Sequence, residues 1–222
     1  VATVEPRVVR DRTFLLVERF DRHRTAEGIV RRIHQEDFCQ ATGTPATLKY
    51  ESDGGPGIDP IMGLLATSAS AERDRRTLFL AQLLFWMLCA PDGHAKNFSL
   101  AILPRGAYAL TPLYDVMSAW PLIGEAPDKL SWHKVRMAMA IRTRNAHWTM
   151  RDIQPRHWME IGKRCGVLDD GGRTVEALID HVVAGIEPAI TQVEAGLPAG
   201  FPEQVAAPIF QGLHQTARMF QA

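Results

Sequence analysis

The most apolar run of the sequence, residues 78–90, limits the fold more than any other segment. It is about 13 residues long and contains Gln82, whereas a helix that spans a bilayer needs roughly 20 apolar residues. Apolar side chains would surround nearly the whole helix that this run forms, so the pattern predicts a buried helix at the centre of a globular core. We expect the helix to begin near Ser70 and to end at Pro91.

The amino-acid composition is that of a globular protein without a broad charged surface. Hydrophobic residues make up 46% of the 222 positions and charged residues 23%, which excludes the disordered and collagen-like classes. Basic and acidic side chains number 25 each, so the formal net charge is zero. The chain therefore lacks the broad basic surface that dominates non-specific binding to nucleic acid.

Cysteine usage and the first residues indicate a reducing compartment. The three cysteines, Cys39, Cys89 and Cys165, are too few and too scattered for a disulfide framework, and no Cys-x-x-Cys pair suggests zinc. Cys39 and Cys89 stand in apolar or helical contexts, so we expect buried free thiols. Residues 1–12 contain no apolar signal-peptide core. We expect a cytoplasmic protein with no membrane-spanning segment.

Hydrophobic periodicity along the rest of the chain predicts an α+β fold that is mostly helical. Residues 13–20 have the composition of a strand, and residues 98–103 and 107–110 flank a Pro-Arg-Gly turn that is typical of a hairpin. After Asp115 the chain is expected to be mostly helical. The predicted helices, besides the central one, cover residues 31–42, 59–67, 154–165, 173–195 and 202–220.

Several polar residues stand close together in the loop after the central helix. Asp92, His94, Lys96 and Asn97 fall within six positions, and Asp115 follows beyond the predicted hairpin. Phosphoryl transfer needs a carboxylate that accepts the substrate's hydroxyl proton, oxygen ligands for Mg²⁺ and a cation. Protein kinases place an Asp five residues before an Asn and a metal-binding Asp after a hairpin. Asp92, Asn97 and Asp115 follow that order.

Each of these residues also has a structural interpretation. Asp92 is compatible with a turn, Asn97 with a cap on backbone groups, and Asp115 with a helix N-cap. His94 taken alone is typical of a structural histidine, and Lys96 of a solvated charge. The combination of the spacing with a preceding helix and a following hairpin favours the catalytic interpretation.

Long stretches of the sequence resemble the HipA kinases of bacterial toxin–antitoxin pairs. The resemblance runs from about residue 13 to the C-terminus and is carried by FLLVERFDR (14–22), HQED (34–37), KYESDGGPG (49–57), DGHAKNFS (92–99) and LTPLYD (110–115). It implies a protein-kinase-like large, C-terminal lobe with a remnant hinge strand of the small lobe. Residues 1–20 would be that remnant and residues 21–222 the HipA-like kinase lobe.

The resemblance also implies roles for individual residues. Asp92 resembles the family's catalytic base, and Asn97 and Asp115 resemble its magnesium ligands. Glu18 to Phe20 resemble the hinge, whose backbone groups bond to the adenine edge, while His94 and Lys96 resemble residues along the phosphate path. The residues expected to bind ATP are Glu18, Arg19, Phe20, His94, Ala95, Lys96, Asn97, Tyr114 and Asp115.

By the same resemblance the cofactors are ATP and Mg²⁺, and the substrate is a serine or threonine hydroxyl on a protein such as an aminoacyl-tRNA synthetase. The expected partner is a small helix-turn-helix antitoxin of the HipB type, which would connect the chain to operator DNA indirectly. Two alternatives stay open. One is a non-catalytic interaction module that binds such an antitoxin, and the other is a small-molecule phosphotransferase of kinase-like fold.

The sequence departs from a full kinase in its first residues. The first lysine is Lys49 and the first glycine is Gly28, so residues 1–12 contain neither a phosphate-covering loop nor a lysine for the α- and β-phosphates. A chain that starts at Val1 rather than methionine suggests a fragment. We expect weak or no ATP binding and no transfer by this polypeptide alone, because positioning and charge stabilisation provide most of the catalysis.

Two further features are ambiguous. The glycines of residues 51–57 do not form Gly-x-Gly-x-x-Gly, so loop geometry is favoured over nucleotide binding. Arg142, Arg144, His147 and Arg151 form a basic stretch. A solvated face is the default interpretation, and contact with DNA or an antitoxin is the alternative.

Overall fold

Helix α3 (Ala71–Met87) occupies the centre of the core, as the apolar run predicts. The computed structural model describes residues 1–10, 12–169 and 171–221. Leu78, Leu83 and Trp86 are fully buried, and the Trp86 indole nitrogen donates to the Met150 carbonyl oxygen at 2.8 Å. The helix therefore buries its aromatic residues without leaving this polar group unpaired.

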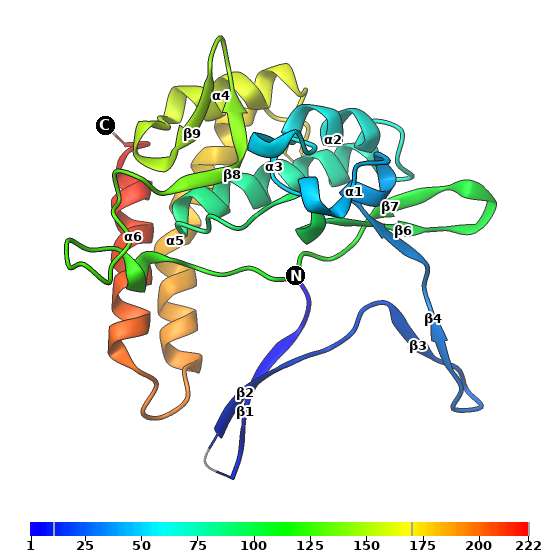
Figure 1. Cartoon of the computed structure of the whole chain (residues 1–222), viewed down its shortest axis with the longest axis horizontal. Coiled ribbons are helices and arrows are strands. Elements are labelled where there is room, and N and C mark those ends of the chain that lie inside the picture. The colour runs from blue at the N-terminus through cyan, green and yellow to red at the C-terminus, as the bar shows by residue number, and fades with distance from the viewer. Residues whose placement is uncertain (11, 170, 222) are drawn as a thin grey trace.

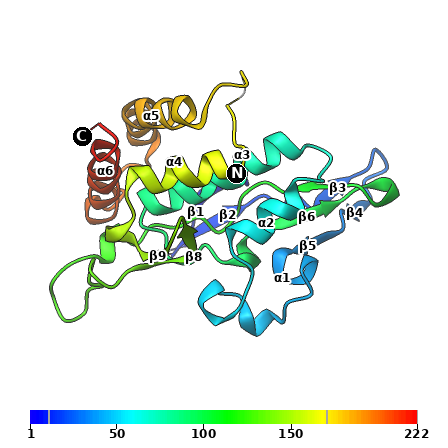
Figure 2. The same cartoon turned by 90° about the horizontal axis from the view of Figure 1, so that it is seen from above.

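Other helices pack around α3. Figure 2 shows α4 lying along α3, and the Phe79 ring of α3 meets the Trp158 ring of α4 edge to face at 6.1 Å. Helices α5 and α6 run antiparallel to each other at one side of the molecule (Figure 1). Gly212 lets α6 approach Trp120, because a Cβ at this position would lie 2.2 Å from the indole. The α-helices other than α3 are α1 (Phe38–Ala41), α2 (Ile58–Leu65), α4 (Pro155–Arg164), α5 (Val175–Gly196) and α6 (Glu203–Arg218). Within the described ranges, none of them is both long and apolar enough to cross a membrane.

The predicted hairpin is confirmed and forms part of a three-stranded antiparallel sheet. Strand β6 (Ser99–Ile102) lies between β5 (Gln35–Asp37) and β7 (Tyr108–Leu110). Leu100 pairs with Leu110, and Asp37 pairs with Ser99. Strand β6 begins directly after the polar loop of residues 91–98 and therefore fixes where that loop ends.

The helix expected over residues 31–42 is wrong for most of its length. Strand β4 (Val30–Arg32) pairs with β3 (Arg22–Arg24), β5 follows, and α1 alone is helical. Ile33 has no apolar neighbour three or four positions later, so a helix here would have no face to bury. Helix α1 begins where Asp37 caps it, since its side chain accepts from the Gln40 backbone nitrogen at 2.9 Å.

The mostly helical structure expected after Asp115 is also wrong in part. Strand β8 (Arg136–Arg142) pairs with β9 (Ala146–Thr149) in a hairpin. The five central residues of β8 are all buried, so the strand is covered on both faces and shows none of the alternation that marks a half-exposed strand. Helices α4, α5 and α6 occupy the later segments as predicted.

The front strand is shorter than predicted. It is β2 (Arg12–Val17), which pairs with β1 (Val4–Val9), so residues 18–20 follow the strand instead of belonging to it. This hairpin lies apart from the helices, as does the β3–β4 hairpin (Figure 1), and the residues of both its strands are exposed. Six α-helices and nine strands among the described residues bear out an α+β fold in which helix predominates.

A buried carboxylate connects the sheet to the start of α3. Asp74 is 1% exposed and accepts hydrogen bonds from the Ser68 hydroxyl at 2.8 Å and the Leu110 backbone nitrogen at 2.9 Å. Arg73 pairs with its second oxygen at 3.0 Å. The end of β7 is thereby held in place before the chain turns towards Asp115.

Replacing Asp74 with alanine should lower the free energy of unfolding by about 2–3 kcal/mol, because the buried Leu110 N–H loses its partner. Urea unfolding followed by circular dichroism measures the change. Glu72→Ala, an exposed change two residues earlier in the same first turn of α3, is the control and should cost less than about 1 kcal/mol. Equal effects of the two substitutions would contradict an anchoring role for Asp74.

Candidate active site

The loop of residues 91–98 is compact and bonded to itself. The Asn97 side-chain nitrogen donates to the Asp92 carbonyl oxygen at 2.8 Å, and the backbone nitrogens of His94 and Asn97 donate to the carbonyls of Asp92 and His94, each at 2.9 Å. His94, Ala95 and Asn97 are buried, while the Asp92 side chain is 38% exposed. The loop therefore presents the Asp92 carboxylate at its surface on a rigid backbone.

Asp115 lies close enough to this loop to act on the charge of His94, and the segment after it is bonded to the end of α3. Three donors, the Ser118 hydroxyl, the Ala119 backbone nitrogen and the Trp120 indole nitrogen, bond to the carbonyls of residues 87–89 at 2.5–2.9 Å. Asp115 itself is exposed and has a left-handed backbone with φ +56°. Asp and Asn tolerate this conformation better than most residues.

The His94 ring is held in its neutral form beside the two carboxylates. Burial lowers the pKa of His94, and Lys49 lowers it further, whereas Asp92 and Asp115 raise that pKa by less. The His94 Nε2 atom lies 3.7 Å from Asp92 Oδ1. Because burial disfavours the charged ring, this contact is not a strong ion pair.

The Lys96 side chain is directed towards the sheet. Its ammonium lies 2.8 Å from Asp37 Oδ2, and Asp37 raises the pKa of Lys96 by hydrogen bonding and by charge. The Lys96 carbonyl accepts from the Tyr114 hydroxyl at 3.0 Å, and this hydroxyl also bonds to Ser99 at 2.6 Å. Lys96 thus helps to fix Tyr114 through its backbone.

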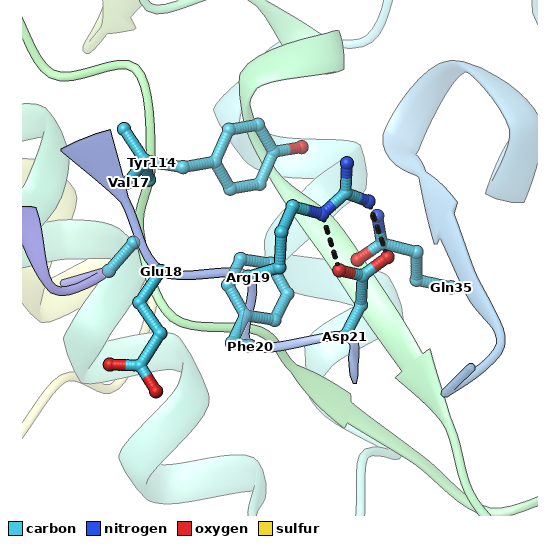
Figure 3. Close-up of a pocket in the computed structure, with 8 residues that line it drawn as sticks. Val17, Glu18, Arg19, Phe20, Asp21, Gln35 and Tyr114 are labelled. Carbon is cyan, nitrogen blue, oxygen red and sulfur yellow. Dashed lines mark hydrogen bonds and ion pairs between the residues drawn. The ribbon is translucent and has the colours of Figure 1, made fainter. Parts of the chain in front are cut away.

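A pocket joins the predicted hinge to Tyr114. Figure 3 shows Phe20 and Tyr114 side by side, with ring centroids 6.0 Å apart, and the Glu18 carboxylate directed away from them. The cavity has a volume of about 270 Å³, at the small end of ligand pockets and suited to a base more than to a whole nucleotide. Its lining residues are Ala2, Val17, Glu18, Arg19, Phe20, Asp21, Gln35 and Tyr114.

Asp21 and Arg19 shape one side of this pocket. The Arg19 guanidinium donates to both carboxylate oxygens of Asp21, at 2.7 and 2.6 Å. Arg19 is the main cause that lowers the pKa of Asp21 to about 2, and Arg22 adds to it. The charged pair of Arg19 and Asp21, one residue on either side of Phe20, thereby holds the backbone around it.

Comparison with known proteins identifies the family. The model of the HipA-like C-terminal domain family matches residues 1–190, more than half of the chain. The chain belongs to this family. The resemblance drawn from residues 14–115 is therefore confirmed at the level of the family.

Relatives of the HipA-like chain carry kinase names. A Sinorhizobium fredii protein named "Putative kinase Y4mE" is 37% identical over 194 residues, which are 87% of this chain and 43% of that protein. The "Serine/threonine-protein kinase toxin HipA" of Shewanella oneidensis is 32% identical over 116 residues, or 47% of this chain and 27% of the relative. The chain thus spans less than half the length of these relatives.

A solved structure shares the fold of the HipA-like chain. It is HipA of Shewanella oneidensis MR-1 in a complex with HipB and its operator DNA, with a TM-score of 0.78 at 23% sequence identity. The match covers all of this chain and 51% of the other chain. The chain therefore has the kinase-like fold of HipA.

The Gly-rich stretch of the HipA-like chain is explained by close packing. A Cβ at Gly55 would lie 2.1 Å from the Leu48 carbonyl oxygen, and one at Gly57 would lie 2.4 Å from the Glu51 carboxyl carbon. Both glycines are needed where the loop closes on itself. This favours the interpretation of loop geometry over that of a phosphate cradle.

Most of the predicted basic stretch is engaged inside the chain. Arg142 pairs with Glu51 at 2.6 Å, the Arg151 guanidinium contacts the His133 ring, and the His147 ring stacks on His157 with centroids 3.8 Å apart. These contacts give the stretch a role in holding the β8–β9 hairpin. Whether it meets DNA or an antitoxin stays a prediction.

Sequence reasoning missed two residues that contact the predicted site. Tyr50 donates to Asp92 Oδ1 at 2.5 Å, and Asp37 binds Lys96, across 42 and 59 positions of sequence. Both stand inside stretches that carry the family resemblance, which is the signal that could have found them. Spacing within the loop could not, because both partners come from other segments.

The carboxylate of Asp21 should support the pocket in a pH-dependent way. Its pKa in the folded chain lies near 2, below the ordinary 3.8, so its stabilisation is complete above pH 3.8 and is lost as the pH falls towards 2. Asp21→Asn should cost about 1 kcal/mol at pH 7, a value reduced for solvent screening of the exposed Arg19. The difference from wild type should shrink below pH 3.8. Urea unfolding at several pH values tests this, with the exposed Glu36→Gln as control. A difference that does not depend on pH would be the opposing result.

Proposed function

We propose that the chain is the large lobe of a HipA-type serine/threonine protein kinase, with residues 1–20 as the hinge side of its small lobe. The reaction is transfer of the γ-phosphoryl group of ATP to a protein hydroxyl. The observation that carries the proposal is the rigid loop that presents Asp92 and buries Asn97, with Asp115 brought to the same loop by the bonds between residues 118–120 and α3. The kinase names of the relatives support it.

Asp92 is the group that accepts the hydroxyl proton. A general base must be within hydrogen-bond reach of the proton that it removes, and the partly exposed Asp92 carboxylate is open to a substrate on one side. Its backbone carbonyl is fixed by Asn97. Transfer of the proton to a positioned carboxylate contributes roughly 10²–10⁴-fold in rate.

The donor set of the site fits a magnesium ion. Asn97 uses its side-chain nitrogen on Asp92, so its amide oxygen is left as an acceptor, and Asp115 supplies an exposed carboxylate. Magnesium is usually held by one or two carboxylates together with waters and substrate phosphates. When bound, the ion would neutralise phosphate charge. Asn97 and Asp115 would hold it.

The hinge pocket fits an adenine ring. Among the described residues, no hydrogen bond engages the Phe20 backbone nitrogen or the Glu18 carbonyl, whereas the Glu18 nitrogen donates to Thr3 at 2.9 Å. One free donor and one free acceptor match the edge of adenine, which offers one of each. Phe20 and Tyr114 would pack against the base. His94, Ala95 and Lys96 would lie along the path of the phosphates.

In a kinase, a lysine before the hinge reaches the α- and β-phosphates. Residues 1–17 contain no lysine, since Lys49 is the first one. Lys96 does not take that role, since its ammonium is paired with Asp37. We therefore assign residues 1–222 the catalytic loop and the hinge, and expect no transfer by them alone. A helix-turn-helix antitoxin is the proposed partner, because the structural relative is bound to HipB and operator DNA.

The base assignment is tested with the complete open reading frame that encodes these residues, whatever it adds to them. Purified wild-type protein incubated with Mg-ATP and a host protein extract should produce new phosphoserine or phosphothreonine, detected by mass spectrometry. Asp92→Asn should lower the rate at least about 100-fold, because the amide cannot accept the proton. Asp180→Asn, an exposed change on α5, should leave the rate unchanged. Phosphorylation at the wild-type rate by Asp92→Asn would refute the assignment.

Asp115→Asn separates metal binding from the other steps. Asparagine tolerates the same left-handed backbone but removes the negative charge, so the Mg²⁺ concentration for half-maximal rate should rise roughly 10–100-fold. Initial rates measured over a series of Mg²⁺ concentrations report the shift. The exposed Asp128→Asn is the control. An unchanged Mg²⁺ requirement in Asp115→Asn would exclude Asp115 as a ligand.

A further inference from the structure

A second loop, residues 46–57, lies directly against the catalytic loop. The Tyr50 hydroxyl donates to Asp92 Oδ1 at 2.5 Å, and the Tyr50 ring meets the His94 ring edge to face with centroids 5.1 Å apart. The Lys49 carbonyl accepts from the Ala95 backbone nitrogen at 3.3 Å. Three contacts therefore join the two loops around the carboxylate that we assign as the base.

The hydrogen bond from Tyr50 gives the two Asp92 carboxylate oxygens different roles. A carboxylate that is 38% exposed can rotate about its side-chain bonds unless a partner holds it. Tyr50 occupies Oδ1 and leaves Oδ2 for a substrate hydroxyl. Asp92 is also the main cause that raises the pKa of Tyr50 to about 12, so the phenol stays protonated and acts as the donor at neutral pH.

Tyr50 is in turn held by the residue that follows it. The Glu51 side chain is 7% exposed, and its carboxylate accepts from the Ala140 backbone nitrogen at 2.7 Å and from the Arg142 guanidinium at 2.6 Å. Both donors belong to β8. Gly57 leaves the space that the Glu51 carboxylate fills. The loop is thus bonded to β8 as well as to Asp92.

We propose that Tyr50 is a positioning residue for the reaction: it holds Asp92 by one oxygen so that the other faces the substrate, and Glu51 anchors Tyr50 to β8. The inference rests on the proposed function of Asp92. A residue with this role should influence the rate of the transfer step and should have little influence on substrate binding, because it touches the base and not the substrates.

The kinetic test compares Tyr50→Phe with wild type in the complete open reading frame product. The substitution keeps the ring and removes the hydroxyl, so kcat should fall roughly 10- to 100-fold while KM for ATP and for the protein substrate stays within about twofold of wild type. Tyr108→Phe removes a hydroxyl that bonds to the Leu64 carbonyl at 2.8 Å, and it should leave kcat unchanged. Glu51→Gln should also lower kcat, but by a smaller factor than Tyr50→Phe.

A spectroscopic test of the same contact needs no activity. In residues 1–222 labelled with ¹³C at tyrosine Cζ, the resonance lost in Tyr50→Phe should titrate near pH 12 in the wild type and nearer the ordinary 10 in Asp92→Asn. A structural role for Tyr50 would not couple its titration to residue 92. Identical titration in the two proteins would overturn the contact.

The outcomes separate this inference from the proposed function. Protein phosphorylation by the wild type with an equal kcat in Tyr50→Phe overturns the positioning role and leaves the kinase proposal standing. A rise in KM with unchanged kcat also overturns it, since Tyr50 would then serve binding. Absence of phosphorylation by the wild type refutes the kinase proposal, and the positioning role fails with it.

Discussion

The buried C-terminal end of α3 is the constraint on which the candidate site depends. A helix leaves its last four carbonyls without partners inside the helix, and each one left unbonded in a core costs about 1–3 kcal/mol. Here three donors from residues 118–120 bond to the carbonyl of the last helical residue, Met87, and to those of the two residues that follow it. Because these carbonyls need donors, the segment of residues 118–120 is held beside the end of α3, where the loop that starts at Pro91 begins. These hydrogen bonds therefore bring Asp115 close enough to act on His94 together with Asp92, although two carboxylates by themselves repel each other.

The resulting site carries more negative than positive charge. The charges of Asp92 and Asp115 both raise the pKa of His94, but burial lowers that pKa by more and favours the neutral ring. The ammonium of Lys96 is paired with Asp37. Lys49 contributes one charge nearby, with its ammonium 4.9 Å from the centre of the Tyr50 ring. Two carboxylates with a single cation leave net negative charge at the site, which a bound divalent ion would offset. This charge balance is compatible with the proposed magnesium ion.

The sequence was most informative where local chemistry decides the structure. The central helix, the hairpin of β6 and β7 and the three C-terminal helices follow from periodicity and from Pro and Gly. Strand β5 could not be predicted because its partner β6 lies far along the chain. Strand β4 is only three residues long and exposed, and β8 is buried on both faces, so neither shows the alternation that marks a strand. In the site, spacing placed Asp92 and Asn97 in one loop, but it could not show that Lys96 turns towards Asp37.

The same limit explains why the support of the proposed base was invisible to motif analysis. Asp92 is held by Tyr50, Tyr50 is fixed beside Glu51, and Glu51 is bonded to β8. The first and last of these links join segments that are 42 and 89 positions apart. A motif identifies the group that does the chemistry because that group must be of one type. The groups that orient it only need to donate from the right direction, and direction is set by the fold.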